Sequence, residues 1–476
     1  GGDEKIVVRA PANADAGNGE VELISNTRSQ VLKTDSWTYE EGSVIVSLSP
    51  ASGQTGTVVT ITGTNMLGVS NGDSIQTLTF GDVDVEVKEF GQSEMIVVIK
   101  SGGTVGAADV FLEANSGADT QLDQGFEYLE TGDIESISPA VGQLGTKVTI
   151  TGARMLGGGA SLDSVTLGGT DATIESADDE TVVVIATASS DLGVGDVVMV
   201  ADTGAIIESA GIWTYAEQSV ITKVDPADGQ ENTKVTISGT NLRGHSDNVV
   251  TVTLAGIEAD ITSEDDDSIE VVAAASGATN GDVKVVSNTG AEATLSDGWV
   301  YYDTGTIDSA EPNFGQYGSV ITISGSTLRG RGAEVVSVTL NGVEATIITE
   351  TDDEVVVEAA AGPDSKEEGD VVLTANTGAT VSTDGIIFTY LRPSKIESVK
   401  PEAGRADSRI TIFGFDLCGG GSAVTEVMLA GVVAELSDVD ECGIIEVTAT
   451  EYGAEITGDV KVVSDSGAIT IASDAW

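Results

Sequence analysis

One internal repeat runs through most of this 476-residue sequence and constrains its fold more than any other feature. Five prolines recur in the same setting at intervals of 89, 87, 86 and 89 residues: Pro50, Pro139, Pro226, Pro312 and Pro401. Each follows a short alternating segment such as VIVSLSP or KIESVKP, and a glycine-containing turn and a segment such as TVVTITG or SVITISG come next. Because proline ends strands and glycine forms tight corners, this order predicts strands joined by turns in every repeat.

Each repeat closes with an aromatic pair in its last predicted strand, after a segment such as GDVKVVSNTGA (281–291). The first aromatic residue is Trp37, Phe126, Trp213, Trp299, Phe388 or Trp476, and a tyrosine follows two residues later at Tyr39, Tyr128, Tyr215, Tyr301 and Tyr390. Residues two apart in a strand face the same side of it. We therefore expect one large core ring in each repeat rather than a platform on which ligands stack.

Composition agrees with an all-β fold. The chain contains 40% hydrophobic but only 4% aromatic residues, together with 59 glycines, which favours many short strands over helices. No stretch shows the 3.6-residue periodicity of an amphipathic helix. Roughly seven strands per repeat, with a turn signal about every 8–12 residues, predict an immunoglobulin-like β-sandwich.

The recurring motifs also carry a family resemblance. I-x-S-x-x-P, G-x-x-G-[ST]-x-[VI]-T-I-x-G, an NTG-like turn and a final [WF]-x-Y together resemble the IPT/TIG domain, with five copies in residues 43–476. The resemblance implies an early-set immunoglobulin fold, known from receptor ectodomains, from accessory modules of carbohydrate-active enzymes and from some transcription factors. It brings no catalytic residues. The expected domains are 1–42 (a partial repeat), 43–131, 132–217, 218–304, 305–391 and 392–476.

The boundaries between repeats are short. Only ten residues separate Tyr128 from Pro139, and ten separate Tyr301 from Pro312, and neither boundary is rich in proline, glycine or serine. We therefore expect tandem immunoglobulin-like repeats forming a semi-rigid rod rather than a flexible string of domains.

Charge excludes several classes of partner. The chain carries 77 acidic and 21 basic residues, a formal net charge of −56, which disfavours nucleic acid and anionic lipid. The DNA-binding members of the family use basic loops, and this chain departs from them. No apolar run approaches the ~18 residues of a membrane span. The opening GGDEK is not a signal peptide, so we expect a processed or truncated chain.

Candidate metal-binding and catalytic residues are few. The acidic turns Asp265-Asp266-Asp267 and Asp352-Asp353 are weak calcium candidates, because they lack the regular spacing of a pre-organised calcium loop. The alternative is that acids suit these turns and keep strand edges soluble. The single histidine, His245, is interpreted as a surface loop residue rather than a catalytic base or a metal ligand, so we expect no enzyme and no cofactor. No N-x-[ST] sequon occurs, whereas O-glycosylation remains open.

The two cysteines belong to the last repeat. When the repeats are aligned with one another, Cys418 takes the place of Arg243 and Arg329, and Cys442 takes the place of Asp266 and Asp352. In an immunoglobulin-like sandwich the two loops concerned lie at the same end. We therefore predict a Cys418–Cys442 disulfide, with Arg243–Asp266 and Arg329–Asp352 ion pairs at the equivalent places, and an oxidising compartment. Two buried free thiols are the alternative.

Residues 1–42 read as the second half of a repeat, and Trp476 stands where the last strand of the fifth repeat begins. Half a sandwich would expose an apolar face, so we expect a neighbouring subunit to cover it by strand addition, unless the sequence is a fragment of a longer chain. The expected function is an extracellular structural protein, the subunit of a rod or filament assembled head-to-tail. The alternative is an adhesin or receptor ectodomain that binds a protein or glycan through its loops.

Overall fold

A computed structural model of the chain describes residues 5–10, 15–68, 72–100, 102–440 and 442–476. Within these ranges the secondary structure consists of β-strands and turns, and no helix is present. The internal contacts divide the chain into two compact units, which are described separately. The first comprises residues 1–218, 244–246 and 288–292, and the second comprises residues 219–243, 247–287 and 293–476.

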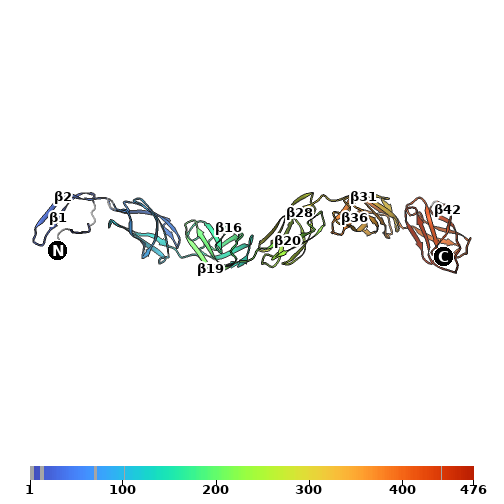
Figure 1. Cartoon of the computed structure of the whole chain (residues 1–476), viewed down its shortest axis with the longest axis horizontal. Helices are drawn as coiled ribbons and strands as arrows, with labels where there is room; N and C mark the ends of the chain where they lie inside the picture. The colour runs from blue at the N-terminus through green and yellow to red at the C-terminus, as the bar shows by residue number, and fades with distance from the viewer. Residues whose placement is uncertain (1–4, 11–14, 69–71, 101, 441) are drawn as a thin grey trace. The chain divides into compact units, whose positions relative to one another are not determined.

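The strands follow the predicted order in every repeat (Figure 1). The partial repeat contains β1 (Gly17–Ile24) and β2 (Gln30–Tyr39). The first complete repeat contains β3 (Val44–Ser49), β4 (Ser52–Gly53), β5 (Val58–Thr64), β6 (Ile75–Phe80), β7 (Val83–Asp84), β8 (Glu86–Phe90), β9 (Glu94–Val98), β10 (Gly106–Ala114) and β11 (Asp119–Tyr128). The second contains β12 (Asp133–Ser138), β13 (Val141–Gly142), β14 (Lys147–Ala153), β15 (Leu162–Leu167), β16 (Thr170–Ala177), β17 (Thr181–Ile185), β18 (Gly193–Ala201) and β19 (Ile206–Tyr215).

The third and fourth repeats keep this order, and the fifth keeps it without the short second strand. The third contains β20 (Val220–Asp225), β21 (Asp228–Gly229), β22 (Lys234–Thr240), β23 (Val249–Leu254), β24 (Ile257–Glu258), β25 (Asp260–Glu264), β26 (Ser268–Val272), β27 (Thr279–Ser287) and β28 (Glu292–Tyr301). The fourth contains β29 (Thr306–Glu311), β30 (Phe314–Gly315), β31 (Val320–Ser326), β32 (Val335–Leu340), β33 (Val343–Glu344), β34 (Thr346–Glu350), β35 (Glu354–Glu358), β36 (Glu367–Ala375) and β37 (Thr380–Tyr390). The fifth contains β38 (Lys395–Lys400), β39 (Arg409–Phe415), β40 (Val424–Leu429), β41 (Val432–Val433), β42 (Glu435–Asp440), β43 (Ile444–Thr448), β44 (Val460–Ser464) and β45 (Ile469–Ala472).

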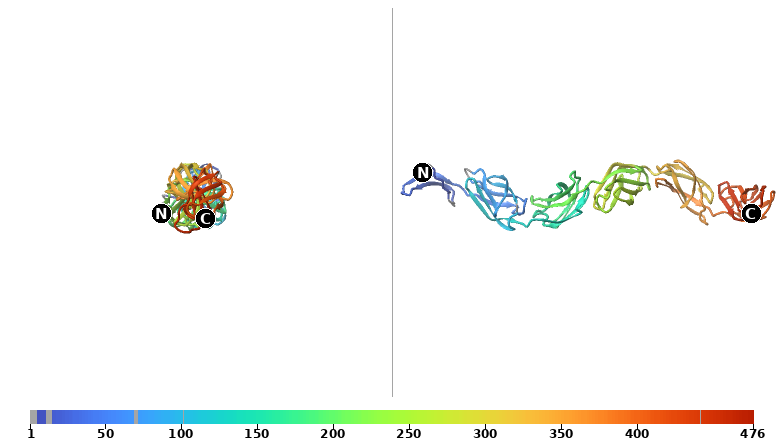
Figure 2. Two further views of the ribbon diagram at one scale, coloured as in Figure 1. Left: turned by 90° about the vertical axis from the view of Figure 1, so that its right-hand side faces the viewer. Right: turned by 60° about the horizontal axis from the view of Figure 1, so that its bottom comes forward.

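Each complete repeat is a sandwich of two sheets (Figures 1 and 2). In the fourth repeat one sheet has the order β29-β31-β35-β34 and the other β30-β37-β36-β32-β33. The recurring proline follows a cis peptide bond and lies between the first two strands. In the fourth repeat it marks the point where the chain crosses from the sheet of β29 to the sheet of β30. In the second repeat the uninterrupted strand β16 pairs in both halves and joins them into one eight-stranded sheet.

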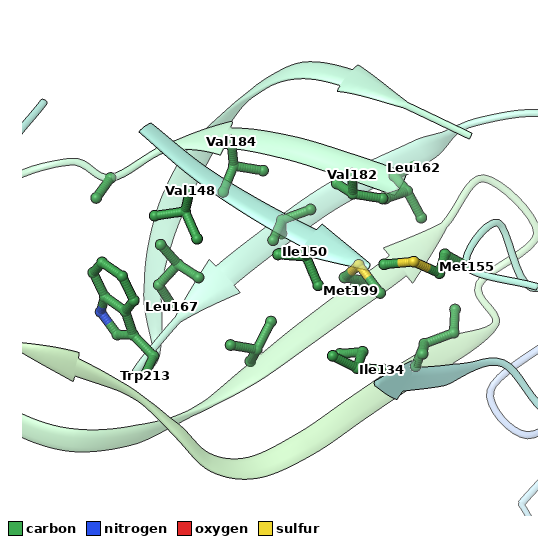
Figure 3. Packing of buried hydrophobic residues seen from close by; sticks show 14 of the residues in the cluster. Ile134, Val148, Ile150, Met155, Leu162, Leu167, Val182, Val184, Met199 and Trp213 are labelled. Carbon is green, nitrogen blue, oxygen red and sulfur yellow. The ribbon is translucent and has the colours of Figure 1, made fainter. Parts of the chain in front are cut away.

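A separate hydrophobic cluster fills each complete repeat, as Figure 3 shows for the second. Side chains that alternate along each strand form this cluster. In β14, Val148 and Ile150 face the core and are buried, whereas Lys147 is exposed. Trp213 is fully buried, and its ring lies edge-on to Tyr215 with centroids 5.4 Å apart. The expected core ring is therefore present, and the all-β immunoglobulin-like fold is confirmed.

Candidate functional site: the joints between neighbouring repeats

Neighbouring repeats within each compact unit meet through two sequence motifs, one from each repeat. The first motif, G-Q-x-x-[TS]-x, follows the short second strand and is called the acceptor loop: residues 53–58, 229–234 and 315–320 of the first, third and fourth repeats. The second motif, the NTG-like turn between the last two strands, is called the docking turn: residues 202–206, 376–380 and 465–469 of the second, fourth and fifth repeats.

A buried glutamine of the acceptor loop spans each joint. The N–H of Gln54 donates to Thr57 Oγ1 at 3.0 Å, which fixes the loop, and Gln54 is only 1% exposed. Its side-chain Oε1 accepts the N–H of Gly132 at 2.7 Å, and its Nε2 donates to the carbonyl of Ile206 at 3.3 Å. One amide group therefore holds both the linker and the docking turn of the following repeat. Because this amide is buried, leaving it unpaired would cost about 1–3 kcal/mol.

The same glutamine recurs at the two described joints of the second unit. Gln230 accepts the N–H of Gly305 at 3.2 Å and donates to the carbonyl of Thr380 at 2.8 Å. Gln316 accepts the N–H of Ser394 at 2.8 Å and its hydroxyl at 3.0 Å. The contact with the linker therefore recurs at all three joints, and the contact with the docking turn is described for Gln54 and Gln230.

Backbone hydrogen bonds reinforce two of the joints in the same pattern. The N–H of Val58 donates to the carbonyl of Thr203 at 2.8 Å, and the N–H of Ile206 donates to the carbonyl of Thr55 at 2.9 Å. Between the fourth and fifth repeats, Val320 donates to Ser466 at 3.1 Å, and Ile469 donates to Tyr317 at 2.8 Å. Loop and turn therefore pair like two short strands.

This close approach requires glycine in the docking turn. Gly204 and Gly467 both have a φ of +81°, and a Cβ at either would lie within 3.0 Å of a carbonyl oxygen of the acceptor loop, that of Gly56 or Gly318. A side chain at this position would therefore push the two repeats apart.

Sequence reasoning assigned both motifs to turns and missed that they bind each other. The signal was present, since neither a tight turn nor a strand end requires the glutamine that four repeats share at Gln54, Gln143, Gln230 and Gln316. A buried amide at a fixed place in each repeat indicates a polar partner.

The predicted disulfide is present in the fifth repeat. Cys418 and Cys442 are bonded, with their Cα atoms 5.2 Å apart, and Cys418 is 2% exposed within the hydrophobic cluster of that repeat. The alignment of the repeats that places Cys442 at the position of Asp352 also holds, because the same backbone bond forms in both repeats. The N–H of Leu328 donates to the carbonyl of Asp352 in the fourth repeat, and the N–H of Leu417 donates to the carbonyl of Cys442 in the fifth.

The predicted ion pairs of Arg243 with Asp266 and of Arg329 with Asp352 are wrong. The guanidinium of Arg243 binds Glu264 with an Nε–Oε2 distance of 2.8 Å, and that of Arg329 binds Glu350 at the same distance. Asp266 instead accepts the backbone N–H of Arg243 at 3.1 Å, as Asp352 accepts that of Arg329.

The physical reason lies in the local backbone. A register shift between Ile261 and Ser263 in β25 places the longer Glu264 side chain against the guanidinium, whereas the aspartate is already engaged by the backbone. In the fourth repeat, Arg329 and the N–H of Val335 together hold the pKa of Glu350 below its usual value.

The calcium candidates act as turn-forming residues. Asp265 Oδ1 accepts the N–H groups of Asp267 and Ser268 at 2.8 and 2.7 Å, and these bonds hold the pKa of the carboxyl below its usual value. Asp352 serves the backbone in the same way, and the next residue, Asp353, accepts the N–H of Gly325 at its carbonyl. Across the described ranges, no three His, Cys, Asp or Glu side chains gather into a metal-binding group.

His245 is likewise engaged by the backbone. Its Nε2 lies 2.9 Å from the carbonyl oxygen of Glu217 at an exposed position. In the part of the chain that the structure describes, no helix is long and apolar enough to cross a membrane.

The partial repeat forms a hairpin with the register of a complete repeat. Gly17 pairs with Tyr39 in β1–β2, as Gly106 pairs with Tyr128 in β10–β11. Trp37 is 45% exposed, however, whereas the equivalent Phe126 is 1% exposed. The apolar face that a complete repeat buries is therefore open to solvent in the hairpin.

Comparison with known proteins identifies the family of four repeats. Residues 43–128, 133–215, 219–301 and 306–390 each match the family model described as the IPT/TIG domain. The fifth repeat lies outside these segments but has the same order of strands apart from the short second strand. No curated protein matches the chain.

Several solved structures resemble the chain at low sequence identity. The full extracellular region of plexin A4 is 15% identical, with 87% of this chain and 42% of that chain covered and a TM-score of 0.34. The N-terminal eight immunoglobulin domains of Down syndrome cell adhesion molecule are 10% identical, with 94% and 71% covered and a TM-score of 0.21. SGBP-B of Bacteroides ovatus, in complex with a mixed-linkage heptasaccharide, is 13% identical, with 74% and 93% covered and a TM-score of 0.18. The chain spans less than half the length of the plexin A4 structures.

Proposed function

The chain belongs to the IPT/TIG domain family, and we propose that it is an extracellular structural protein, a stalk whose joints limit the movement of each repeat against the next. The buried glutamine of the joints carries this proposal, because it ties the linker and the docking turn of one repeat to the loop of its neighbour. The disulfide supports an oxidising, extracellular location. The proposal assigns no catalytic step, metal or cofactor to the chain.

Distance measurements between spin labels test the stalk. No described cysteine is free, so labels can be attached at Asp308→Cys in β29 and Glu446→Cys in β43, two exposed positions on the fourth and fifth repeats. We expect a narrow distance distribution in the native chain and a broad one after Gln316→Ala. Gln121→Ala, which removes an exposed glutamine of the first repeat, is the matched control. A distribution that is equally broad with and without Gln316 would contradict the proposal.

A second candidate function, head-to-tail assembly into a filament, is favoured by the hairpin β1–β2. Its exposed face includes Trp37, Leu23 and Val21, and strand addition by a second copy would remove this face from water. Negative-stain images of the purified chain should then show filaments that Trp37→Ser abolishes. Isolated particles at every concentration would rule this assembly out and would leave loop-mediated binding of a protein or glycan as the alternative role.

A further inference from the structure

A third segment takes part in the joint between the fourth and fifth repeats. It comprises residues 416–423, between β39 and β40, and is called the bridging loop. Ser422 donates to the carboxylate of Asp465 through its hydroxyl at 2.5 Å and through its backbone N–H at 2.9 Å. The hydroxyl of Ser466 donates to the carbonyl of Gly419 at 3.2 Å. Because Asp465 and Ser466 begin the docking turn, the bridging loop holds that turn in place.

The bridging loop also contacts the linker and the acceptor loop. The hydroxyl of Ser394 in the linker is shared between Oε1 of Gln316 and the carbonyl of Asp416. A Cβ at Gly419 would lie 2.7 Å from Nε2 of Gln316, so the backbone of the bridging loop lies directly against the buried glutamine. The bridging loop therefore joins all three parts of this joint.

Each repeat anchors its bridging loop to its own body at one position. In the fifth repeat the anchor is the disulfide at Cys418. In the fourth repeat the equivalent anchor is the ion pair of Arg329 with Glu350. The loop that it holds has the same geometry, because a Cβ at Gly330 would lie 3.3 Å from Nε2 of Gln230. Two joints of the same construction therefore depend on different chemical bonds.

A surface pocket gives small molecules access to the disulfide. The pocket has a volume of about 280 Å³, lies between the linker and the bridging loop, and is lined by both cysteines. Cys442 is partly exposed, whereas Cys418 is 2% exposed, so a reagent in the pocket meets the sulfur of Cys442 first. The guanidinium of Arg392 also lines the pocket and offsets the carboxylate of Asp416 there. In this strongly acidic chain, Arg392 favours the approach of an anionic thiolate.

We propose that the Cys418–Cys442 disulfide is a site of thiol–disulfide exchange, and that its cleavage by a small thiol loosens the joint between the fourth and fifth repeats. The inference rests on the stalk function proposed above, because it assigns chemical control to one joint of the stalk. A thiolate attacks the sulfur of Cys442, the sulfur–sulfur bond breaks, and the sulfur of Cys418 leaves with the electron pair and takes up a proton. A second thiol then displaces Cys442, so two reagent thiols are oxidised to one disulfide and both cysteines are reduced.

The reduced repeat should stay folded but lose the anchor of its bridging loop. Cys418 belongs to the hydrophobic cluster of the fifth repeat, and a neutral thiol can remain there. The second repeat has Leu156 at this place, packed against its own cluster, and forms a complete joint. A thiol is smaller than leucine and carries no charge, so it replaces neither the packing of Leu156 nor the ion pair of Arg329. The bridging loop would therefore become free to move away from Gln316.

Spin-label distances before and after reduction test the proposal on the full chain. Labels joined through thioether bonds, which reductants do not cleave, are placed at exposed positions that are equivalent in the repeats. Asp308→Cys and Glu397→Cys report on the joint between the fourth and fifth repeats, and Thr222→Cys and Asp308→Cys report on the preceding joint. Dithiothreitol under native conditions is the probe, and alkylation with mass spectrometry reports the state of Cys418 and Cys442. We expect the narrow distance distribution to be lost at the first joint and kept at the second, and reoxidation should restore it.

Three controls separate the joint from the repeat. Cys418→Ala together with Cys442→Ala should give the broad distribution without dithiothreitol and should not respond to it. Labels at Glu397→Cys and Thr425→Cys, both within the fifth repeat, should keep a narrow distribution after reduction. Arg329→Ala removes the anchor of the fourth repeat, so it should broaden the preceding joint and leave the joint with the disulfide unchanged.

Four results would overturn the proposal: a disulfide that dithiothreitol leaves intact in the folded chain, a joint that stays narrow after both cysteines are reduced, equal broadening at the preceding joint, or loss of the narrow distance within the fifth repeat. Failure of the stalk is distinguishable from these results, because the oxidised chain would then show a broad distribution before any reductant is added.

Discussion

Removing the disulfide should destabilise the fifth repeat selectively. The change is Cys418→Ala together with Cys442→Ala, and it acts at a place that the other repeats fill differently. The fourth repeat has the Arg329–Glu350 ion pair there, and the first two have Leu67 and Leu156. The fold therefore does not need the bond to form, and the bond adds stability to one repeat.

The size of the effect follows from the length of the closed loop. The two cysteines are 24 residues apart, and in the chain-entropy model such a cross-link stabilises the folded state by about 3.5 kcal/mol. Because each repeat has its own core, most of this loss should stay within the fifth repeat. Amide exchange in β39 and β43 should accelerate by roughly 300-fold, whereas β31 and β35 of the fourth repeat should change little.

Hydrogen exchange followed by mass spectrometry measures these strands in the full chain. Arg329→Ala is the matched variant, since it empties the same place in the fourth repeat without cutting a covalent bond, and its effect should be smaller. Acceleration of less than about tenfold in β39 and β43 would refute the reasoning, as would equal acceleration in the fourth repeat.

Three further predictions concern pH and salt. Arg329 lowers the pKa of Glu350 in the folded chain. The stabilisation from the ionised Glu350 is therefore present above the unfolded pKa of about 4.5 and is lost as pH falls through the folded pKa. Thermal melts of Glu350→Gln should show less of this acid sensitivity. Burial raises the pKa of Tyr390 from 10.0 to about 12. The stabilisation from the neutral Tyr390 is therefore present below pH 10 and is lost as pH rises through about 12. Tyr390→Phe should resist alkaline unfolding better, by up to about 3 kcal/mol in the free energy of unfolding. Melting temperatures should rise with added salt, because the net charge of −56 is then screened, and an unchanged midpoint would contradict this.

The repeats and their cores could be predicted because they depend on local order in the sequence. Pro312 and Gly315 fix a strand end and a corner within a few residues, and Phe388 and Tyr390 face one side of a strand by their spacing. These relations hold inside one repeat, whatever its neighbours are. The disulfide could be predicted for a related reason, since equivalent positions in several repeats showed which two loops lie together.

The joints and the arginine partners could not be predicted in this way. Gln54 and the carbonyl that it contacts are 152 residues apart, and the interval alone does not indicate which loop meets which turn. For Arg243, the alignment with the two cysteines predicts Asp266 as the partner, but a bulge in β25 brings Glu264 to the guanidinium instead. Both errors concern side-chain partners that depend on how strands and repeats meet.

Amide exchange at equivalent positions of one chain tests the joints most directly. The N–H groups of Val320 and Ile469 donate across the joint between the fourth and fifth repeats. Arg409 in the loop 404–409 of the fifth repeat and Asp119 in the turn 115–119 of the first repeat take the equivalent positions, and their N–H groups have no such partner among the described residues. In dilute solution we predict strong protection of Val320 and Ile469, rapid exchange of Arg409 and Asp119, and loss of the protection after Gln316→Ala. Equal exchange rates at all four positions, or protection that survives Gln316→Ala unchanged, would contradict joints that hold the repeats together.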